Sequence, residues 1–182
     1  MNGHIEVLVQ DVTSLARQKG VDVSELSSSD FHPSTLAKGM AVRGLFIGNG
    51  PQSETIAACE GCTLLPFRPH RELPPYYRAA EIGVWPTQES MSMLDAAACA
   101  LPIIVNDTLI ARERIEGNGI TYRLNDADDL AEKIRWLSDP DRRRELGSTG
   151  ARRMVELFSW GAIARQRLAD YEAAVTSRRR SA

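Results

Sequence analysis

The run IGVWPTQESMSMLDAAACALPIIV, residues 82–105, decides the fold. The apolar segment IGVW stops at Pro86, a polar loop follows, and an alanine-rich segment leads directly into a second apolar segment, LPIIV. This order is typical of a strand–loop–helix–strand unit in a parallel α/β sheet. The expected helix N-terminus presents unpaired backbone N–H groups and the positive end of the helix dipole, which suit a phosphate. Two carboxylates beside it, Glu89 and Asp95, are placed to bind sugar hydroxyls. The run therefore predicts a nucleotide-sugar site.

Length and composition indicate one compact domain. The chain has 182 residues, of which 43% are hydrophobic, and a chain of this length buries roughly two-thirds of its unfolded surface. A formal net charge of -2 does not favour nucleic acid as a partner, and we interpret the arginines at 178–180 as a solvated tail. We find no apolar run of membrane-spanning length and no signal pattern at the N-terminus, so we expect no integral membrane segment and a cytoplasmic location.

The three cysteines do not predict a disulfide framework or a metal site. Cys59 and Cys62 form a CxxC pattern, and a zinc site needs four ligands. The remaining candidates have no paired spacing: Cys99, His4, His32 and His70. We interpret the CxxC as the end of a helix and the start of a strand, and we expect neither a metal nor a cofactor.

Strand and helix patterns alternate through the middle of the chain. Residues 5–19 repeat apolar side chains near helical spacing and predict an N-terminal helix, and the polar, serine-rich residues 20–40 predict a loop or linker. Further strands are expected at 44–48, 62–67, 81–85, 101–105 and 120–124. Further helices are expected at 51–59, within 72–80, from about 92, at 126–137, from 140 toward 158 and at 160–174. This alternation predicts an α/β fold, with a Rossmann-like, mostly parallel sheet and helices on both faces.

Three residues mark the starts of two helices in the C-terminal part of the chain. Asp126 and Asp139 stand at N-cap positions, and Pro140 follows Asp139 at the favoured first helical position. Gly147 and Gly150 are expected to weaken the helix that begins at Pro140, because glycine has low helix propensity.

Residues 44–175 resemble the C-terminal, nucleotide-sugar-binding half of retaining GT-B glycosyltransferases of family four. The resemblance rests on GLFIGNGP, LLPFRPHRELPPYYRAAEIGVWP, ESMSMLDAAACALPIIV and DPDRRRELGSTGARRMVELFSW, in this order. It implies half of a GT-B fold and transfer of a sugar from a nucleoside-diphosphate sugar, with retention at the anomeric carbon and without a metal. It also implies a division into an N-terminal remnant with helix and linker (1–42), a donor-binding domain (43–175) and a basic tail (176–182).

The family's acidic signature, two glutamates separated by seven residues, is carried over only in part. Counting from LDAAACALP places Asp95 at the second position, which binds ribose in the family. The first position falls on Thr87, which cannot carry the charge. Glu89 is the nearest acid and our candidate catalytic residue, if the loop is two residues tighter than in the family; the alternative is that Glu89 has another role.

Two serines in the same loop are further candidates for donor binding. The resemblance places Ser90 near the diphosphate, and its alternative is an ordinary loop residue. Ser92 and Asp95 also fit a capping box, in which both side chains satisfy the first N–H groups of the helix. A capping box needs no ligand, so it competes directly with ribose binding by Asp95.

Other candidates come from loops that the family places around the cleft. In GNGP, Gly48 and Gly50 correspond to the cleft floor, and Ser53 stands where a dinucleotide fingerprint requires its third glycine. His70 corresponds to a loop near the nucleotide base; its alternative is an exposed loop histidine. The family also contributes a lysine, which Lys38 resembles, and a loop acid, which Glu113 resembles. An alternative interpretation of Glu113, Arg112 and Arg114 is that their charges are simply exposed to solvent.

The sequence offers a donor site without an acceptor domain. GT-B enzymes bring their substrates together in a cleft between two domains, and stabilisation of the transition state requires groups from both sides of that cleft. We therefore expect a glycosyltransferase-type domain that binds the donor and needs a protein partner to supply the acceptor side. The alternative is a degenerate, non-catalytic interaction module or a gene fragment.

Overall fold

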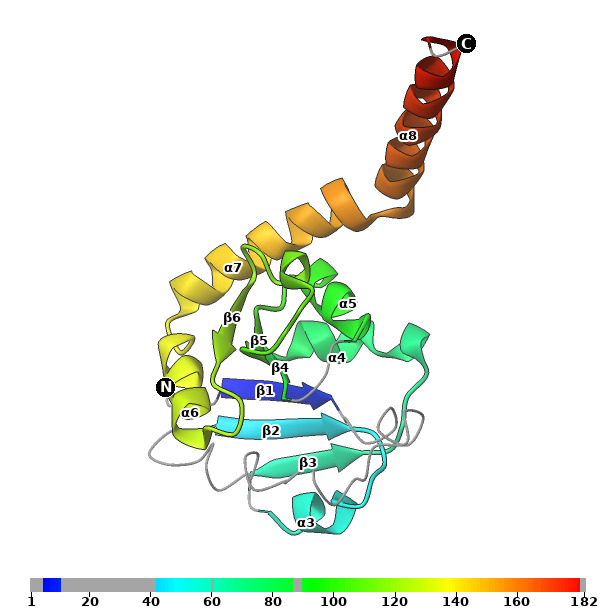
Figure 1. The fold of residues 1–182 in the computed structure, drawn as a ribbon. Coiled ribbons are helices and arrows are strands. Elements are labelled where there is room, and N and C mark those ends of the chain that lie inside the picture. Colours follow the sequence, from blue (N-terminus) through cyan, green and yellow to red (C-terminus); the bar gives the residue numbers. More distant parts are fainter. Residues whose placement is uncertain (1–4, 11–41, 60, 87–89, 181–182) are drawn as a thin grey trace.

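The computed structural model describes residues 5–10, 42–59, 61–86 and 90–180. Its centre is one parallel sheet with the strand order β3-β2-β1-β4-β5-β6 (Figure 1). The strands are β1 Ile5–Gln10, β2 Val42–Ile47, β3 Cys62–Leu65, β4 Ile82–Trp85, β5 Ile103–Asn106 and β6 Gly119–Tyr122. The parallel Rossmann-like sheet predicted from the alternating pattern is confirmed.

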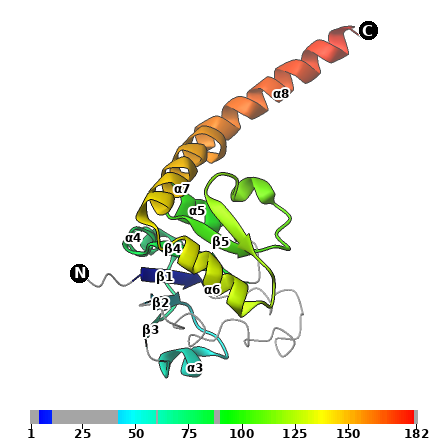
Figure 2. The ribbon, with the colours of Figure 1, turned by 90° about the vertical axis from the view of Figure 1, so that its left-hand side faces the viewer.

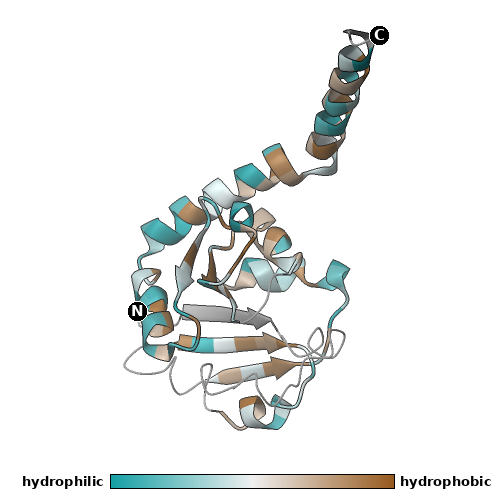
Figure 3. Ribbon diagram, in the orientation of Figure 1, coloured by the Kyte–Doolittle hydropathy of each residue, from teal (hydrophilic) through white to brown (hydrophobic). Residues whose placement is uncertain are grey.

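Helices cover both faces of the sheet. They are α3 Ser53–Ala57, α4 Pro74–Ala79, α5 Ser92–Ala98, α6 Ala127–Trp136, α7 Pro140–Arg153 and α8 Trp160–Arg180. Shorter turns are η2 His70–Glu72, η3 Arg112–Arg114 and the π-helical η4 Met154–Phe158. Side chains of β5 alternate between two cores: Ile103 and Val105 pack with α4 and α5, whereas Ile104 packs with α6. Figure 3 shows that hydrophilic residues gather on the outward surfaces of α6 and α7.

The predicted N-terminal helix is wrong for residues 5–10. They form β1, which pairs with β2 on one side and with β4 on the other, so β1 lies in the middle of the sheet. The β-branched residues Ile5, Val7 and Val9 suit a strand, and the pairing partners lie far away in sequence. The region 1–42, in which we expected a helix and a linker, thus contributes a central strand to the sheet. Residues 11–41 lie outside the described part of the chain.

The C-terminal helix boundaries agree in part with the prediction. Asp126 accepts a hydrogen bond from the amide of Asp129 at 2.9 Å, and Asp139 accepts one from the amide of Asp141 at 2.9 Å, so both N-caps are confirmed. The helix expected at 160–174 is longer and runs to Arg180. The expectation of a separate basic tail from 176 is wrong for 176–180, which continue α8.

Gly147 and Gly150 are sites of close packing on α7. A Cβ atom at Gly147 would lie 2.1 Å from the carbonyl oxygen of Ala100, and one at Gly150 would lie 2.6 Å from the Cβ of Asn118. Both glycines are buried, and the missing side chains let α7 approach the end of α5 at Gly147 and the residue before β6 at Gly150. Their low helix propensity is offset by this contact, which the sequence pattern did not reveal.

Candidate functional site

The candidate residues gather at the carboxyl edge of the sheet. The GNGP loop follows β2, η2 with His70 follows β3, and the start of α5 follows β4. In parallel α/β sheets all these loops lie at one edge, where ligands bind in the crevice at the strand ends. The topology therefore brings together segments that are more than forty positions apart, from Gly48 to Asp95.

A chain of hydrogen bonds fixes the start of α5. The buried Trp85 donates its indole N–H to the Oγ of Ser92 at 3.1 Å, and the Oγ atoms of Ser92 and Ser90 are 2.8 Å apart. The amide of Ser92 also donates to the Oγ of Ser90 at 3.3 Å. Ser92 is buried, whereas Ser90 is half-buried, so Ser92 lies below the surface and supports Ser90.

Asp95 turns toward η2 rather than back onto its own helix. Its Oδ2 lies 2.7 Å from Nε2 of His70, and the two side chains are 34% and 76% exposed, respectively. The N-cap of α5 is Met91, and no side chain caps this helix. The capping box of Ser92 and Asp95 is therefore not formed, because their side chains bind Trp85 and His70 instead. The carboxylate of Asp95 remains accessible to a ligand.

The backbone amides at this helix start are partly occupied. Those of Ser92, Met93 and Leu94 donate to atoms of Ser90 and Met91, so the first turn is less open than the sequence suggested. Within the described part of the chain, the amides of Ser90 and Met91 make no hydrogen bond. Because α5 has only seven residues, its dipole alone is a weak basis for anion binding. Any anion here depends on these two amides and the Ser90 hydroxyl.

Two buried side chains anchor the end of β4, and sequence reasoning missed both. The carbonyl oxygen of Pro86 accepts hydrogen bonds from Nδ2 of Asn106 at 2.8 Å and from the hydroxyl of Tyr122 at 3.0 Å. Asn106 is 5% exposed and closes the apolar run of β5, a position where a polar residue signals a specific hydrogen-bond role. Together they fix the point at which the chain enters the candidate loop.

Three sequence positions cannot be placed. Thr87, Glu89 and Lys38 lie outside the described residues, so the catalytic role expected for Glu89 and the donor contact expected for Lys38 stay predictions.

The glycines of the GNGP loop are held by the chain itself. Gly48 has a φ of 146°, and its amide donates to the carbonyl of Leu65 at 3.0 Å. The amide of Gly50 donates to Oγ of Ser53 at 3.0 Å, and this hydroxyl donates back to the carbonyl of Gly50 at 2.8 Å. Ser53 thus closes the turn in place of a third glycine. Both glycines lie at the expected edge, but their amides already have partners.

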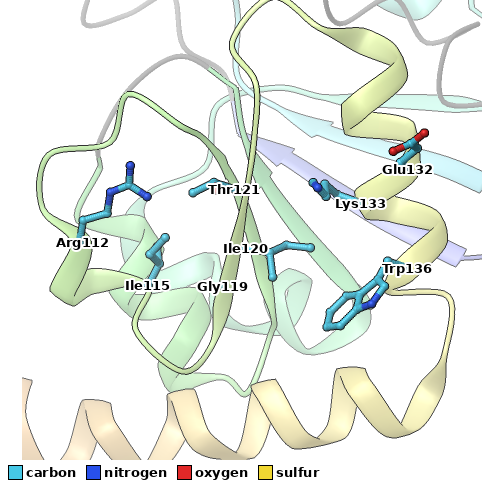
Figure 4. A pocket seen from close by; sticks show the side chains of 8 residues that line it. All are labelled: Arg112, Ile115, Gly119, Ile120, Thr121, Glu132, Lys133 and Trp136. Atoms are coloured by element: carbon cyan, nitrogen blue, oxygen red, sulfur yellow. The ribbon is translucent and has the colours of Figure 1, made fainter.

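Glu113 and a pocket lie beside strand β6. The pocket has a volume of about 540 Å³, and of the loop residues considered in the sequence analysis only Arg112 lines it (Figure 4). Its lining residues are Arg112, Ile115, Gly119, Ile120, Thr121, Glu132, Lys133 and Trp136. Glu113 is exposed on η3, next to Arg112, and makes no hydrogen bond or ion pair among the described residues.

The CxxC cysteines form no disulfide and lie at the end of α3 and the start of β3, as the sequence indicated. Burial raises the pKa of Cys62 to about 12, with a further contribution from the adjacent Cys59. A thiol that stays protonated at neutral pH is a poor nucleophile and a poor metal ligand. The described residues contain no cluster of three side chains that could bind a metal, and no helix among them is long and apolar enough to cross a membrane.

The sheet order and the carboxyl-edge loops define a Rossmann-like half of a GT-B fold. Sucrose-phosphate synthase from Thermosynechococcus elongatus shares this fold with a TM-score of 0.70 and 24% identity, over 95% of this chain and 46% of that one. Anabaena HepE in complex with UDP and glucose gives 0.64 and 15%, over 92% and 48%. The catalytic domain of Helicobacter pylori cholesterol-alpha-glucosyltransferase gives 0.64 and 15%, over 84% and 98%.

The sequence comparisons give the family. Residues 8–139 match the family described as "Glycosyl transferases group 1", and the chain belongs to it. The D-inositol 3-phosphate glycosyltransferase of Geodermatophilus obscurus is 36% identical over 132 residues, which are 68% of this chain and 29% of that protein. The MMP alpha-(1->4)-mannosyltransferase of Mycolicibacterium hassiacum is 33% identical over 111 residues, which are 57% and 27%. The chain thus spans less than a third of these relatives.

Proposed function

We propose that this chain is the donor-binding half of a retaining glycosyltransferase and binds a nucleoside-diphosphate sugar at the start of α5. The observation that carries the proposal is the cluster of Ser90, Asp95 and His70 at the carboxyl edge of the sheet in a chain of this family. HepE, which shares this fold, was determined in complex with UDP and glucose, and this supports a nucleotide-sugar as the ligand class.

Each group in the cluster has a role that its chemistry suits. The hydroxyl of Ser90 and the amides of Ser90 and Met91 donate hydrogen bonds to the diphosphate. Asp95 accepts hydrogen bonds from the ribose hydroxyls, and His70 holds the carboxylate in place at 2.7 Å. Glu89 acts near the transferred sugar, and Lys38 contributes positive charge over the phosphates. As the resemblance implies, the reaction needs no metal.

The acceptor side comes from elsewhere in this proposal. Sucrose-phosphate synthase and HepE are each about twice as long as the chain, and the two curated relatives described above are longer still. Efficient transfer requires groups held on both sides of the reacting atoms and shielded from water. We assign this second wall to a protein partner or to sequence beyond the present chain.

A non-catalytic module that keeps the fold is the second candidate. Two observations favour it: Thr87 stands where the family has its first glutamate, and the first-turn amides of α5 already have partners. Nucleotide binding separates the two candidates without requiring turnover.

The decisive measurement is thermal unfolding with UDP, GDP or ADP. A ligand at one hundred times its dissociation constant adds about 2.7 kcal/mol to the folded state, and we expect one clear responder. Asp95→Asn should weaken the binding of that nucleotide by roughly 1–3 kcal/mol. The matched control is Glu145→Gln, which neutralises an exposed acid on α7 and should leave binding unchanged. No response to any nucleotide at millimolar concentration would support the non-catalytic module.

A further inference from the structure

The proposed function gives no role to the CxxC pair, Cys59 and Cys62. The two residues flank the turn that joins α3 to β3, the strand at one edge of the sheet (Figures 1 and 2). The amide of Cys62 donates a hydrogen bond to the carbonyl of Cys59 at 3.2 Å, which is the bond that closes a β-turn. The first and fourth Cα atoms of such a turn lie within about 7 Å, and disulfides join Cα atoms about 4.4–6.8 Å apart. The backbone therefore holds the two cysteines within reach of a disulfide.

The sheet fixes this turn in place. Cys62 pairs with Gly44 of β2, and the amide of Gly44 donates to the carbonyl of Gly61 at 2.9 Å. Gly61 has a φ of 83°, a conformation that glycine adopts without strain. The side chains of Cys59 and Cys62 are hydrogen-bonded to each other, so both thiols lie on the same side of the turn. Little rearrangement is needed to bring the two sulfur atoms together.

The surroundings of the pair favour a disulfide over two thiols. Both cysteines are half-buried, and Cys62 packs against the core cluster that contains Phe46 and Val84. Burial and the neighbouring Cys59 raise the pKa of Cys62 to about 12. In strongly oxidising cysteine pairs, a low pKa stabilises the reduced form as a thiolate. Cys62 has no such stabilisation, and an uncharged disulfide suits its apolar surroundings.

We propose that Cys59 and Cys62 form a reversible redox site whose oxidant is a small-molecule disulfide. The thiolate of Cys59 attacks one sulfur of this molecule, which releases one small thiolate and leaves a mixed disulfide on Cys59. The thiolate of Cys62 then attacks the Sγ of Cys59, which forms the internal disulfide and releases the second small thiolate. The released thiolates take up the two protons that the cysteines lose. Two protein thiols are thus oxidised, and one small disulfide is reduced to two thiols.

The difference between the two cysteines sets the order of the steps. Cys62 stays protonated at neutral pH because of its raised pKa, so Cys59 attacks first. Reaction of Cys59 removes the neighbouring thiol that contributes to the raised pKa of Cys62, and this assists the second step. Burial of Cys62 persists, so the second step remains the slower one.

The redox site lies apart from the candidate donor site. Cys62 begins β3 at its amino end, whereas the GNGP loop and His70 lie beyond the carboxyl ends of the strands (Figure 1). Oxidation therefore ties the end of α3 to the edge strand and leaves the donor-binding groups unchanged. Its test does not depend on nucleotide binding.

The first test exposes the full chain to oxidised glutathione and identifies the remaining thiols by alkylation and mass spectrometry. Of the three cysteines we expect only Cys99 to be alkylated, because Cys59 and Cys62 are joined within one chain, and dithiothreitol should restore all three. Cys62→Ser should stop at a mixed disulfide on Cys59. The matched control Cys99→Ser should still lose both remaining thiols. The inference is overturned if Cys59 and Cys62 remain alkylatable, or if they are joined only between two chains.

The second test measures how the two steps depend on pH. Below the pKa of Cys62 its thiolate fraction rises about tenfold per pH unit, and the rate of the second step should rise with it. The mixed disulfide on Cys59 should therefore accumulate transiently at pH 7 and disappear faster at pH 9, as followed by mass spectrometry of acid-quenched samples. Loss of the mixed disulfide at a rate independent of pH would show that Cys62 is not the attacking group, and would overturn the inference.

Discussion

Replacement of Gly147 by alanine tests whether the contact between α7 and α5 stabilises the domain. The added Cβ would lie 2.1 Å from the carbonyl oxygen of Ala100 and 3.0 Å from its carbonyl carbon. Cβ atoms essentially never come closer than 3.0 Å to another heavy atom, so one of the two backbones must move by about 1 Å. Neither backbone can relieve the clash by a simple rotamer change.

The expected cost is the difference between two opposing effects. Overpacking a well-packed site costs about 1–3 kcal/mol, and a clash with backbone belongs at the upper end. The higher helix propensity of alanine stabilises the helix by up to about 1 kcal/mol and so offsets part of this cost. We therefore expect a net loss of about 2 kcal/mol, which corresponds to a fall of about 4–8 °C in Tm for a domain of this size.

Thermal and urea unfolding, followed by circular dichroism, measure this loss. The matched control is Gly161→Ala on α8, where the nearest atom is the flexible end of Arg165 at an ordinary 3.5 Å, so stability should not fall. If Gly147→Ala is as stable as the wild type, the close approach of α7 to α5 does not constrain the fold as we argue.

Two further predictions concern single residues. Asp129 accepts a hydrogen bond from the amide of Arg123 at 2.7 Å, and this bond, with help from Lys133, lowers the pKa of the carboxyl group. The contribution of this carboxylate to stability is present above the unfolded pKa of about 4 and is lost as pH falls through the native pKa. Asp129→Asn should therefore lower the free energy of unfolding in urea by roughly 1–3 kcal/mol at pH 7, and the difference from the wild type should disappear in acid. A difference that does not depend on pH would contradict the assignment. Ala100 has a φ of 61° and an exposed side chain, so Ala100→Gly should raise the free energy of unfolding by about 0.5–1 kcal/mol, and a loss of stability would show that its backbone is not strained.

The elements defined by local signals were predicted well from the sequence. Asp126 and Asp139 cap their helices as expected, because a cap depends on residues only two or three positions away. The strands around 82–85 and 103–106 follow from short apolar runs with clear boundaries. The fold class could therefore be derived from pattern alone.

The errors arose where distant partners decide the outcome. Residues 5–10 look helical by spacing, but pairing with β2 and β4 makes them a strand. Ser92 and Asp95 match a capping box, but Trp85 and His70 offer them partners from other elements. Gly147 is a weak helix position by propensity, and only the structure shows that the backbone of Ala100 lies too close for any side chain there. None of these contacts leaves a trace in local periodicity.

The position of β1 has a consequence for how the chain reaches its final shape. Val7 aligns with Ile82, and the described residues between them include the strands β2 and β3 and the helices α3 and α4. Such long-range pairing slows folding, because a large loop closes before the contact forms. Loss of the first ten residues would divide the sheet into two parts, β2–β3 and β4–β5–β6. Each part would then have a newly exposed edge strand, whose unpaired backbone N–H and C=O groups promote aggregation. The six residues of β1 thus join the two parts of the sheet into one.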